Sequence, residues 1–442
     1  MAEQISSLQT GIKYKETPIG KIPVDWEVIP VDKICKIKRG ASPRPIGDPS
    51  YFSESGRGWV RISDVTSTYK YLKKTTQYLS EEGVSKSVKV EPGNLIMSIC
   101  ATVGKPIIVD MKACIHDGFV FFSDLSKHVE KIYLFYFLQK NEKKISGKGQ
   151  IGTQGNLNTD IVKKTLLPLP TFPEQKKIAE ILTTIDDAIE KTAQIIEKTR
   201  EAKKGLMQRL LTRGIGHHKF KKTEIGEIPE EWKIKKLIDT AKNEKYSFTG
   251  GPFGSNLKED SYTAYGVRII QLQNIGDGQF LDNYKIFTSE EKADELKSCN
   301  IFPDDIIIAK MADPVARACF IPKTDKRYLM ASDGIRLSVD KNEYDLNFIL
   351  YVINSKYFRE NAERHSTGTT RLRIGLTDLR NLPLAIPPLS EQKQIAGILF
   401  SIDEEIKKEL QHKEQLESLK KGLMQVLLTG KVRVNVNYEA DI

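Results

Sequence analysis

The chain is poor in cysteine and has no long hydrophobic run. Its five cysteines are an odd set without a Cys-x-x-Cys pair, so neither a disulfide framework nor a zinc ribbon is expected. The six histidines have no cysteines or carboxylates at ligand spacing, and we expect no metal site. No apolar stretch approaches the roughly 18 residues of a membrane helix, and no secretory signal is visible. We therefore expect a cytoplasmic protein with reduced thiols and no membrane partner.

Sequence motifs of several enzyme classes are also missing. The chain has no G-x-x-x-x-G-K-[ST] loop for a nucleotide phosphate and no G-x-S-x-G nucleophile elbow. Its single Pro-Pro pair follows Ile386, so the Asn-Pro-Pro-aromatic motif of amino-methyltransferases is absent. A nuclease would need clustered carboxylates and a lysine around a metal ion. FPDDIIIAK at residues 302–310 has Ile308 where a second acid would stand. We expect no catalytic residue and no bound cofactor.

The chain does have an excess of positive charge. Its 68 Lys and Arg residues outnumber 58 Asp and Glu residues, for a net charge of +10. This balance favours a polyanionic partner, with nucleic acid ahead of an acidic membrane. No basic amphipathic helix with aromatic anchors is present, which disfavours the membrane. A length of 442 residues is more than one ordinary domain.

The sequence contains a long internal repeat. KKGLMQRLLT at residues 203–212 returns as KKGLMQVLLT at residues 420–429, and TPIGKIPVDW returns as TEIGEIPEEW. PLPTFPEQKKIAEILTTIDDAI, ending at Ile189, matches AIPPLSEQKQIAGILFSIDEEI, ending at Ile406. Weaker matches align VRISDV with VRIIQL and HDGFVFF with SDGIRLS. Because the order of these segments never changes, the chain is predicted to contain two similar units.

Each copy combines short strands with helices. Apolar runs bounded by Gly and Pro predict strands, and longer stretches predict a helix in each copy. The predicted strands are residues 94–99, 107–110 and 119–122 in the first copy and 306–309 and 317–321 in the second; the predicted helices are residues 131–142 and 346–362. The fold class is therefore α+β, with two similar mixed α/β domains.

A long helix follows each mixed domain. Ile178, Leu182, Ile185 and Ile189 begin a stripe that steps by three and four residues, as in a coiled coil. Each helix is expected to span about 40 residues, roughly 60 Å, which is too long to bury against one small domain. We expect the two helices to form an antiparallel coiled coil, with the units related by an internal pseudo-twofold axis. The predicted divisions are residues 1–170 (first mixed domain with an N-terminal extension), 171–215 (central spacer helix), 216–388 (second mixed domain) and 389–442 (distal spacer helix and C-terminal tail).

Two glycines interrupt these helices. Gly205 and Gly422 occupy the same place in the repeated decapeptide, and glycine in a helix costs about 1 kcal/mol relative to alanine. Two interpretations are open. Each glycine either allows a close crossing with a neighbouring element of the chain, or forms a docking notch for a helix of another protein.

Each mixed domain also carries two polar, glycine-bearing loops at matching places. Glycine allows close backbone approach, and Arg, Lys, Gln, Asn, Ser and Thr contact phosphates and base edges. Plain solvated loops are the alternative. The helix sequences are similar in the two copies, whereas these loop sequences differ. One scaffold is therefore predicted to recognise two different targets. The candidate DNA-binding residues are Lys38, Arg39, Ser42, Arg44, Lys148, Gln150, Thr153, Gln154 and Asn156 in the first copy and Ser255, Asn256, Lys258, Thr369, Thr370, Arg371 and Arg373 in the second.

These motifs resemble a known family. The doubled EQ-x-x-I-A-x-I-L motif, preceded by proline in each copy and followed by a long helix, the IGEIPEEW segment and the GPFGSNLK loop are similar to the specificity subunit of type I restriction-modification systems. The resemblance covers essentially the whole chain. It implies that each mixed domain is a target-recognition domain reading one half of a bipartite, asymmetric site in double-stranded DNA. It also implies that the helices set the spacing between half-sites and dock the partner subunits.

The resemblance further implies a division of labour. Two methyltransferase (modification) subunits would bring S-adenosylmethionine and the adenine-N6 methylation, and motor-nuclease (restriction) subunits would bring ATP, Mg and DNA cleavage. The chain itself would be a non-catalytic subunit. Two alternatives stay open, a self-sufficient DNA-modifying or DNA-cleaving enzyme and a coiled-coil DNA-binding scaffold. Arg61 and Arg268, aligned by the VRISDV and VRIIQL segments, are either structural or DNA contacts.

Overall fold

The computed structural model describes residues 13–147, 157–311, 313–369 and 371–436. The chain divides into two compact units. Unit 1 contains Met1–Ala193 and Gln411–Ile442, and unit 2 contains Gln194–Leu410. Two long helices, α6 (Phe172–Arg213) and α11 (Leu389–Leu427), each contribute to both units. Each unit is therefore a mixed domain together with part of each long helix.

Unit 1 is built on two five-stranded sheets. They share no strand, and the chain passes between them repeatedly, the last time at the turn between β12 and β13. Their orders are β4 (Lys36–Arg39), β13 (Phe119–Ser123), β10 (Leu95–Ser98), β11 (Pro106–Val109) and β7 (Tyr71–Leu72), and β5 (Phe52–Ser53), β8 (Gln77–Leu79), β6 (Arg57–Val60), β12 (Ala113–Ile115) and β9 (Val88–Val90). Its other elements are β1 (Tyr14–Lys15), β2 (Ile22–Pro23), β3 (Glu27–Pro30), β14 (Leu166–Leu169), α2 (Ile62–Thr66), α3 (Glu81–Ser85), α4 (Lys131–Ser146) and α5 (Thr159–Lys163).

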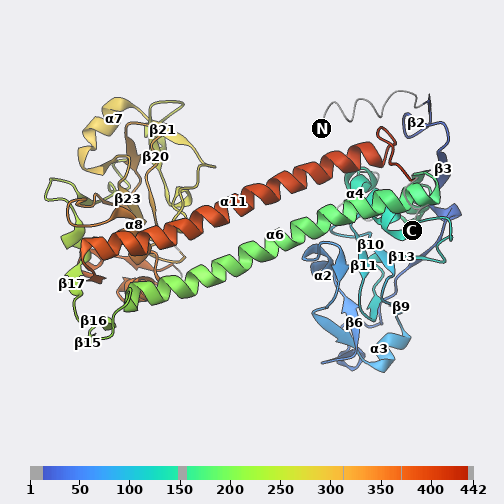
Figure 1. Ribbon diagram of the computed structural model, residues 1–442, viewed down its shortest axis with the longest axis horizontal. Helices are drawn as coiled ribbons and strands as arrows, with labels where there is room; N and C mark the ends of the chain where they lie inside the picture. The colour runs from blue at the N-terminus through green and yellow to red at the C-terminus, as the bar shows by residue number, and fades with distance from the viewer. Residues whose placement is uncertain (1–12, 148–156, 312, 370, 437–442) are drawn as a thin grey trace. The chain divides into compact units, whose positions relative to one another are not determined.

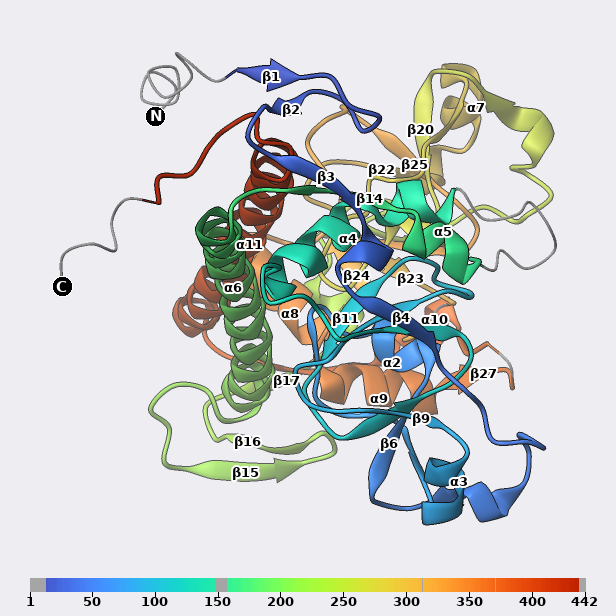
Figure 2. The same ribbon diagram turned by 90° about the vertical axis from the view of Figure 1, so that its right-hand side faces the viewer.

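Unit 2 repeats this plan with a four-stranded and a five-stranded sheet. Their orders are β18 (Phe248–Gly250), β26 (Gly334–Leu337), β23 (Ile306–Ala309) and β24 (Ala318–Phe320), and β19 (Tyr262–Thr263), β21 (Ile286–Thr288), β20 (Val267–Ile270), β25 (Tyr328–Met330) and β22 (Asn300–Ile301). The remaining elements are the pairs β15 (Phe220–Thr223) with β16 (Gly226–Pro229), β17 (Lys233–Lys236) with β29 (Pro383–Ile386) and β27 (Ser366–Thr367) with β28 (Arg373–Ile374), and the helices α7 (Glu290–Glu295), α8 (Leu346–Ile353), α9 (Lys356–Arg364) and α10 (Leu376–Asn381). Figure 2 shows the β15–β16 hairpin beside the end of α6.

The long helices run antiparallel within each unit (Figure 1). In unit 1, Glu174 pairs with Arg433 beyond the end of α11, whereas Asp186, three turns further along α6, pairs with Lys420. In unit 2, Lys203 pairs with Asp403. The predicted antiparallel arrangement is confirmed. The apolar stripe also joins the core of each unit, because Ile178 and Leu182 pack with Leu427 around α4 in unit 1.

The paired Glu and Gln of the repeated motif have separate tasks. Glu174 accepts a hydrogen bond from the indole N–H of Trp26 at 3.1 Å, and Glu391 does the same for Trp232 at 3.0 Å. Gln175 accepts from the backbone N–H of Glu130 at 2.8 Å, just before α4. Gln392 accepts from the backbone N–H before α8 at 2.9 Å. The motif therefore fastens the long helix to the start of its own domain and to that domain's main helix.

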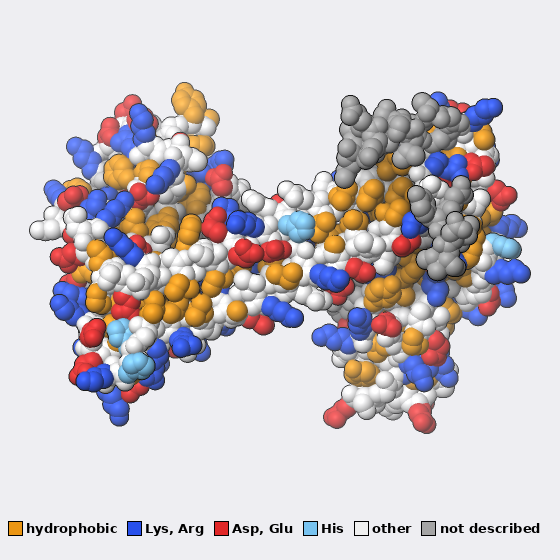
Figure 3. All heavy atoms as spheres, viewed as in Figure 1, with side chains coloured by type: hydrophobic (Ala, Val, Ile, Leu, Met, Phe, Trp, Pro, Cys, Tyr) orange, Lys and Arg blue, Asp and Glu red, His pale blue; other side chains and the backbone are white. Residues whose placement is uncertain are grey.

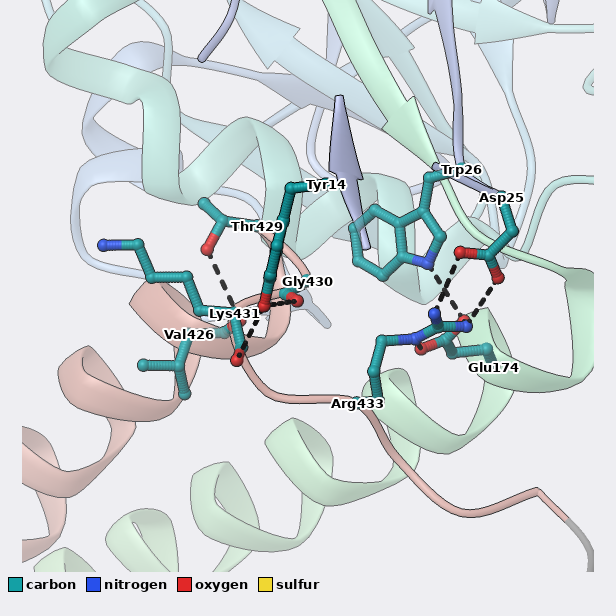
Figure 4. A network of polar contacts seen from close by, with 9 residues as sticks. All are labelled: Tyr14, Asp25, Trp26, Glu174, Val426, Thr429, Gly430, Lys431 and Arg433. Atoms are coloured by element: carbon teal, nitrogen blue, oxygen red, sulfur yellow. Dashed lines mark hydrogen bonds and ion pairs between the residues drawn. The ribbon is translucent and has the colours of Figure 1, made fainter. Parts of the chain in front are cut away.

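The side chain that completes this junction comes from beyond the end of the other long helix. In unit 1, Arg433 bridges Glu174 and Asp25 and lies over the ring of Trp26 (Figure 4). In unit 2, His217 beyond α6 lies 2.9 Å from the Glu391 carboxylate. Each mixed domain is therefore held by the start of its own helix and by the end of the helix that belongs to the other sequence copy.

Three sequence expectations are corrected. The predicted helix at residues 346–362 is two helices, α8 and α9, because Ser355 stops the first and caps the second by accepting a hydrogen bond from the Phe358 N–H. Gly205 and Gly422 are exposed, and apart from the helix's own neighbouring backbone no heavy atom of the described residues lies within 4 Å of a Cβ built at either. The close-crossing interpretation of these glycines is therefore wrong. The third correction, to the alignment of Arg61 with Arg268, concerns the candidate site.

The predicted domain limits stay predictions, since the two compact units divide the long helices rather than following those limits. Within the described ranges, no helix is both long and apolar enough to cross a membrane.

Candidate nucleic-acid interface

The first candidate site surrounds the turn between β12 and β13. Asp117 in this turn accepts a hydrogen bond from the hydroxyl of Ser42 at 2.6 Å, and its backbone carbonyl accepts from Nε of Arg39 at 2.8 Å. The guanidinium of Arg44 lies 3.6 Å from the same carboxylate. The Ser42 hydrogen bond is the main cause that lowers the pKa of Asp117, so this carboxyl is ionised at neutral pH. The structure thus brings together three of the predicted residues.

Gly40 explains how this loop comes so close to the turn. A Cβ built at Gly40 would lie 2.1 Å from the carbonyl oxygen of His116, a clash with backbone that only glycine avoids. In unit 2, a Cβ at Gly251 would lie 1.9 Å from the carbonyl oxygen of Ala331. The first loop of each domain therefore crosses the same turn at the same place, even though the two loop sequences differ.

Beneath the turn, His116 is half-buried as a neutral ring. Its Nδ1 accepts a hydrogen bond from the Gly118 N–H at 2.9 Å, and its ring packs edge-on against Phe119. Burial is the main cause that lowers the pKa of His116 to about 4; Asp117 opposes this shift and Arg61 adds to it. At neutral pH the positive charge of this site therefore comes from arginines.

The second candidate site lies around the equivalent turn of unit 2. Arg373 on β28 pairs with Asp333 at 2.9 Å, and the Asp333 carbonyl accepts a hydrogen bond from the Lys310 N–H at 2.7 Å. A neighbouring hollow of about 400 Å³ is lined by Arg371, Arg317 and Leu272 among others. The structure thus places the predicted Arg373 against this turn and the predicted Arg371 at the neighbouring hollow.

The other predicted residues lie elsewhere or outside the described residues. Lys38 is exposed on β4. Ser255, Asn256, Lys258 and Thr369 are exposed in loops, and within the described ranges no hydrogen bond or ion pair joins them to Asp333. Lys148, Gln150, Thr153, Gln154, Asn156 and Thr370 fall outside the residues that the structure describes. None of these observations tests DNA contact, so all the chosen residues stay predictions.

Sequence reasoning missed two equivalent basic residues. Lys105 donates to the Thr66 carbonyl at 3.0 Å, and Arg317 donates to the Leu272 carbonyl at 2.9 Å. Both residues directly precede the second strand of a hairpin, β11 in unit 1 and β24 in unit 2. Burial lowers the pKa of Lys105. Because one residue is Lys and the other Arg within unlike loops, only the strand register could have matched them.

The alignment of Arg61 with Arg268 is wrong. Arg268 is the second residue of β20, is 5% exposed, and donates hydrogen bonds to Asp282 and to the Tyr284 carbonyl. Arg61 instead follows the last residue of β6 and precedes α2. The match between VRISDV and VRIIQL is therefore displaced by three residues from the structural alignment. Of the two arginines, Arg268 has a structural role.

The sequence profile of the type I restriction modification DNA specificity domain matches residues 23–199 and again residues 216–418. The chain belongs to this family. It is 28% identical over 437 residues to the MjaVIII type I restriction enzyme specificity subunit of Methanocaldococcus jannaschii, covering 96% of this chain and 97% of that protein. It is 31% identical to the putative MjaX specificity subunit of the same organism, covering 95% and 97%.

Solved structures agree on the fold. The type I restriction-modification S subunit of M. genitalium has a TM-score of 0.55 at 15% identity, covering 95% of this chain and 97% of that chain. A chain from a structure on complex assembly and conformational transition of the type I R-M system has a TM-score of 0.56 at 16% identity, with 92% and 99% covered. The α+β fold with two specificity domains is confirmed.

Proposed function

We propose that this chain is the DNA-reading subunit of a type I restriction-modification complex, with unit 1 and unit 2 each reading one half of a bipartite, asymmetric site. One observation carries the proposal: a specificity domain occurs twice, and the same scaffold presents different polar side chains at an equivalent edge. Arg39, Ser42 and Arg44 surround the turn in unit 1. Arg373 holds the turn in unit 2, with Arg371 beside it in the sequence.

The chemistry of these side chains suits a duplex. Arginine bonds phosphate and guanine with a planar pair of N–H donors, while Ser, Thr and Gln contact base edges. Asp117 and Asp333 neutralise part of the charge and hold the arginines in place, so fewer side-chain rotamers must be fixed when DNA binds. Phosphate contacts will supply most of the affinity, and base contacts the preference for one sequence.

In this proposal the chain is not itself an enzyme. Two methyltransferase subunits bind the long helices and carry S-adenosylmethionine and the adenine-N6 chemistry, and motor-nuclease subunits carry ATP and Mg. The outer faces of the helices support such docking. Leu419 is 49% exposed one turn before the open Gly422 in unit 1, and Ile195 is 49% and Phe400 is 48% exposed in unit 2. Hydrophobic side chains reach the surface along the unit 2 part of the helices (Figure 3).

The proposal is tested by sequencing methylated adenines in cells that express the chain with its methyltransferase subunits. We expect one asymmetric motif of two short half-sites separated by a fixed gap. Exchanging residues 17–170 for those of another such protein should change one half-site and leave the other intact, because each domain reads alone. A change in both half-sites would contradict the proposal that each domain recognises its half-site independently.

Assays on the purified chain separate the alternatives. A self-sufficient enzyme would methylate or cleave DNA as the purified chain supplied with S-adenosylmethionine or Mg²⁺. A plain scaffold would bind DNA without sequence preference once salt is raised. We expect neither result, and we expect methyltransferase subunits to co-purify with a tag on this chain.

A further inference from the structure

The strand pairing identifies one position that is the same in both domains. Val60, the last residue of β6, pairs in parallel with Ile115 just before the unit 1 turn. Ile270, the last residue of β20, pairs in parallel with Met330 just before the unit 2 turn. The residues that follow are Arg61 and Gln271. These two residues are therefore structural equivalents, although the sequence repeat aligns Arg61 with Arg268.

The backbone of this position is fixed in the same way in both units. The N–H of Arg61 donates to the Asp64 carboxylate at 2.9 Å, and the N–H of Gln271 donates to the Asn274 side-chain oxygen at 3.0 Å. Asp64 is 5% exposed and Asn274 is fully buried. Because main-chain groups make these bonds, the two side chains can differ without any change in the fold.

In unit 1 the side chain at this position is a cation without a partner. Arg61 is half-buried and close enough to the His116 ring to affect its charge, at the turn that also holds Arg39 and Arg44. Within the described part of the chain, its guanidinium forms no hydrogen bond or ion pair. By contrast, Arg57, four residues earlier, bonds Glu91 and two backbone carbonyls. Arg61 is therefore not used to hold the fold together.

In unit 2 the equivalent side chain is an amide. The oxygen Oε1 of Gln271 accepts a hydrogen bond from Gln273 at 3.2 Å, and its Nε2 lies 3.5 Å from the hydroxyl of Tyr262. The next residue, Leu272, lines the hollow that also contains Arg371. Gln271 is half-buried and held by a polar neighbour that is itself exposed.

We propose that Arg61 and Gln271 are equivalent specificity-determining residues, with Arg61 reading a guanine in one half-site and Gln271 reading an adenine in the other. Arginine donates two hydrogen bonds to O6 and N7 of guanine, and glutamine both accepts from N6 and donates to N7 of adenine in the major groove. This inference rests on the proposed function, because it needs a duplex lying against both turns.

The test exchanges the two residues. The whole chain, assembled with its methyltransferase subunits, is allowed to select from a pool of random duplex DNA, and the bound fraction is sequenced. Arg61→Gln should change the preferred base at one position of one half-site from guanine to adenine. Gln271→Arg should make the opposite change at one position of the other half-site. Each variant should bind the original site about tenfold or more weakly, the usual effect of one lost bidentate base contact.

Three controls make the result decisive. Lys127→Gln and Asn342→Arg make the same charge changes at exposed positions outside the long helices and the candidate loops, one in each unit, and should leave the selected sequence unchanged. Arg61→Lys keeps the charge but loses the planar pair of donors, so it should relax the guanine preference. If Arg61→Lys and Arg61→Gln both select the original sequence, Arg61 contacts only phosphate and the inference is overturned. If the unaltered complex selects no bipartite site, the proposed function itself has failed.

Discussion

At the residue scale, burial decides what a given side chain does. Glu174 and Glu391 stand at the same place in the repeat and accept the same indole hydrogen bond, yet one is bridged by Arg433 and the other by His217. The carboxylates of Glu174 and Asp25 raise the pKa of the Arg433 guanidinium, chiefly through the hydrogen bond between Arg433 and Glu174. Arg433 therefore keeps its positive charge in this junction.

The neutral His116 makes unit 1 sensitive to acid. Its pKa is lowered from 6.5 to about 4 by burial, so the stability linked to this group is complete above pH 6.5 and is lost as the pH falls toward 4. We expect a loss of up to about 3 kcal/mol in the local free energy of opening across that window. Amide hydrogen exchange of β13 measures it.

The matched variant is His116→Asn, whose side-chain oxygen can still accept the hydrogen bond from the Gly118 N–H. It should remove most of the difference between pH 7 and pH 4.5 at β13. An unchanged pH dependence in this variant would assign the acid sensitivity to other groups.

At the element scale, the long helices carry identical residues at equivalent positions of the repeat, but these residues are buried to different extents in the two units. Asp186 is 3% exposed and accepts hydrogen bonds from Lys420 and from the hydroxyls of Tyr69 and Tyr136. Its counterpart Asp403 accepts from Lys203 and Tyr351, but its side chain is 38% exposed. Burial lowers the pKa of Lys420, and the adjacent Asp186 carboxylate opposes that shift.

We therefore expect Lys420→Ala to destabilise the protein by about 3–5 kcal/mol, because it leaves a buried carboxylate without its cation. Lys203→Ala should cost only about 1 kcal/mol or less, since water can replace the lost partner of Asp403. Urea unfolding of the full chain compares the two variants.

The double variant Lys420→Met with Asp186→Asn should recover part of the loss, because neither member of this pair is then left as an unpaired charge. The buried Lys70 beside it keeps its hydrogen bonds to Tyr136 and Thr183. Equal costs for the two single alanine variants would show that burial does not distinguish these pairs.

At the scale of the whole molecule, the repeat makes each unit depend on both sequence copies. The mixed domain of unit 1 packs against the start of α6 and the end of α11, and that of unit 2 packs against the end of α6 and the start of α11. Neither sequence copy supplies all the residues of a junction by itself. In the proposed function, the length of the helices between these two junctions sets the gap between half-sites.

Inserting one heptad in both helices tests this, between Ala193 and Gln194 in α6 and between Leu410 and Gln411 in α11. Seven residues add about 10 Å, so the gap in the methylated motif should grow by about three base pairs. Methylome sequencing gives the gap directly. The same insertion in α6 alone should abolish methylation, because the two helices no longer match; an unchanged gap in the double insertion would rule out the helices as a ruler.

Much of the fold could be predicted from the sequence alone. The repeated segments located both long helices, and the proline and EQ pair at the start of each segment indicated where the helices begin. Runs such as the one that forms β23 indicated strands because they are fully apolar. The break between α8 and α9 was missed because a single serine cap is a weaker signal than the apolar periodicity around it.

The candidate site was only partly predictable. Loop composition selected Arg39, Ser42 and Arg44, which the structure does gather around Asp117. It passed over Lys105 and Arg317, and it misaligned Arg61, because equivalence between unlike sequences is defined by strand register and backbone hydrogen bonds rather than by matching letters.

By itself, the sequence determined that the protein has two similar α+β domains, two long helices with apolar stripes, and an excess of basic residues. These are local properties of composition and spacing. Only the tertiary structure decided that Gly40 and Gly251 bring different loops to the same turn, that Lys420 is buried while Lys203 is not, and that Arg61 corresponds to Gln271. The reason is physical: burial and strand register depend on contacts between residues far apart in the chain, and those contacts exist only once the chain has folded.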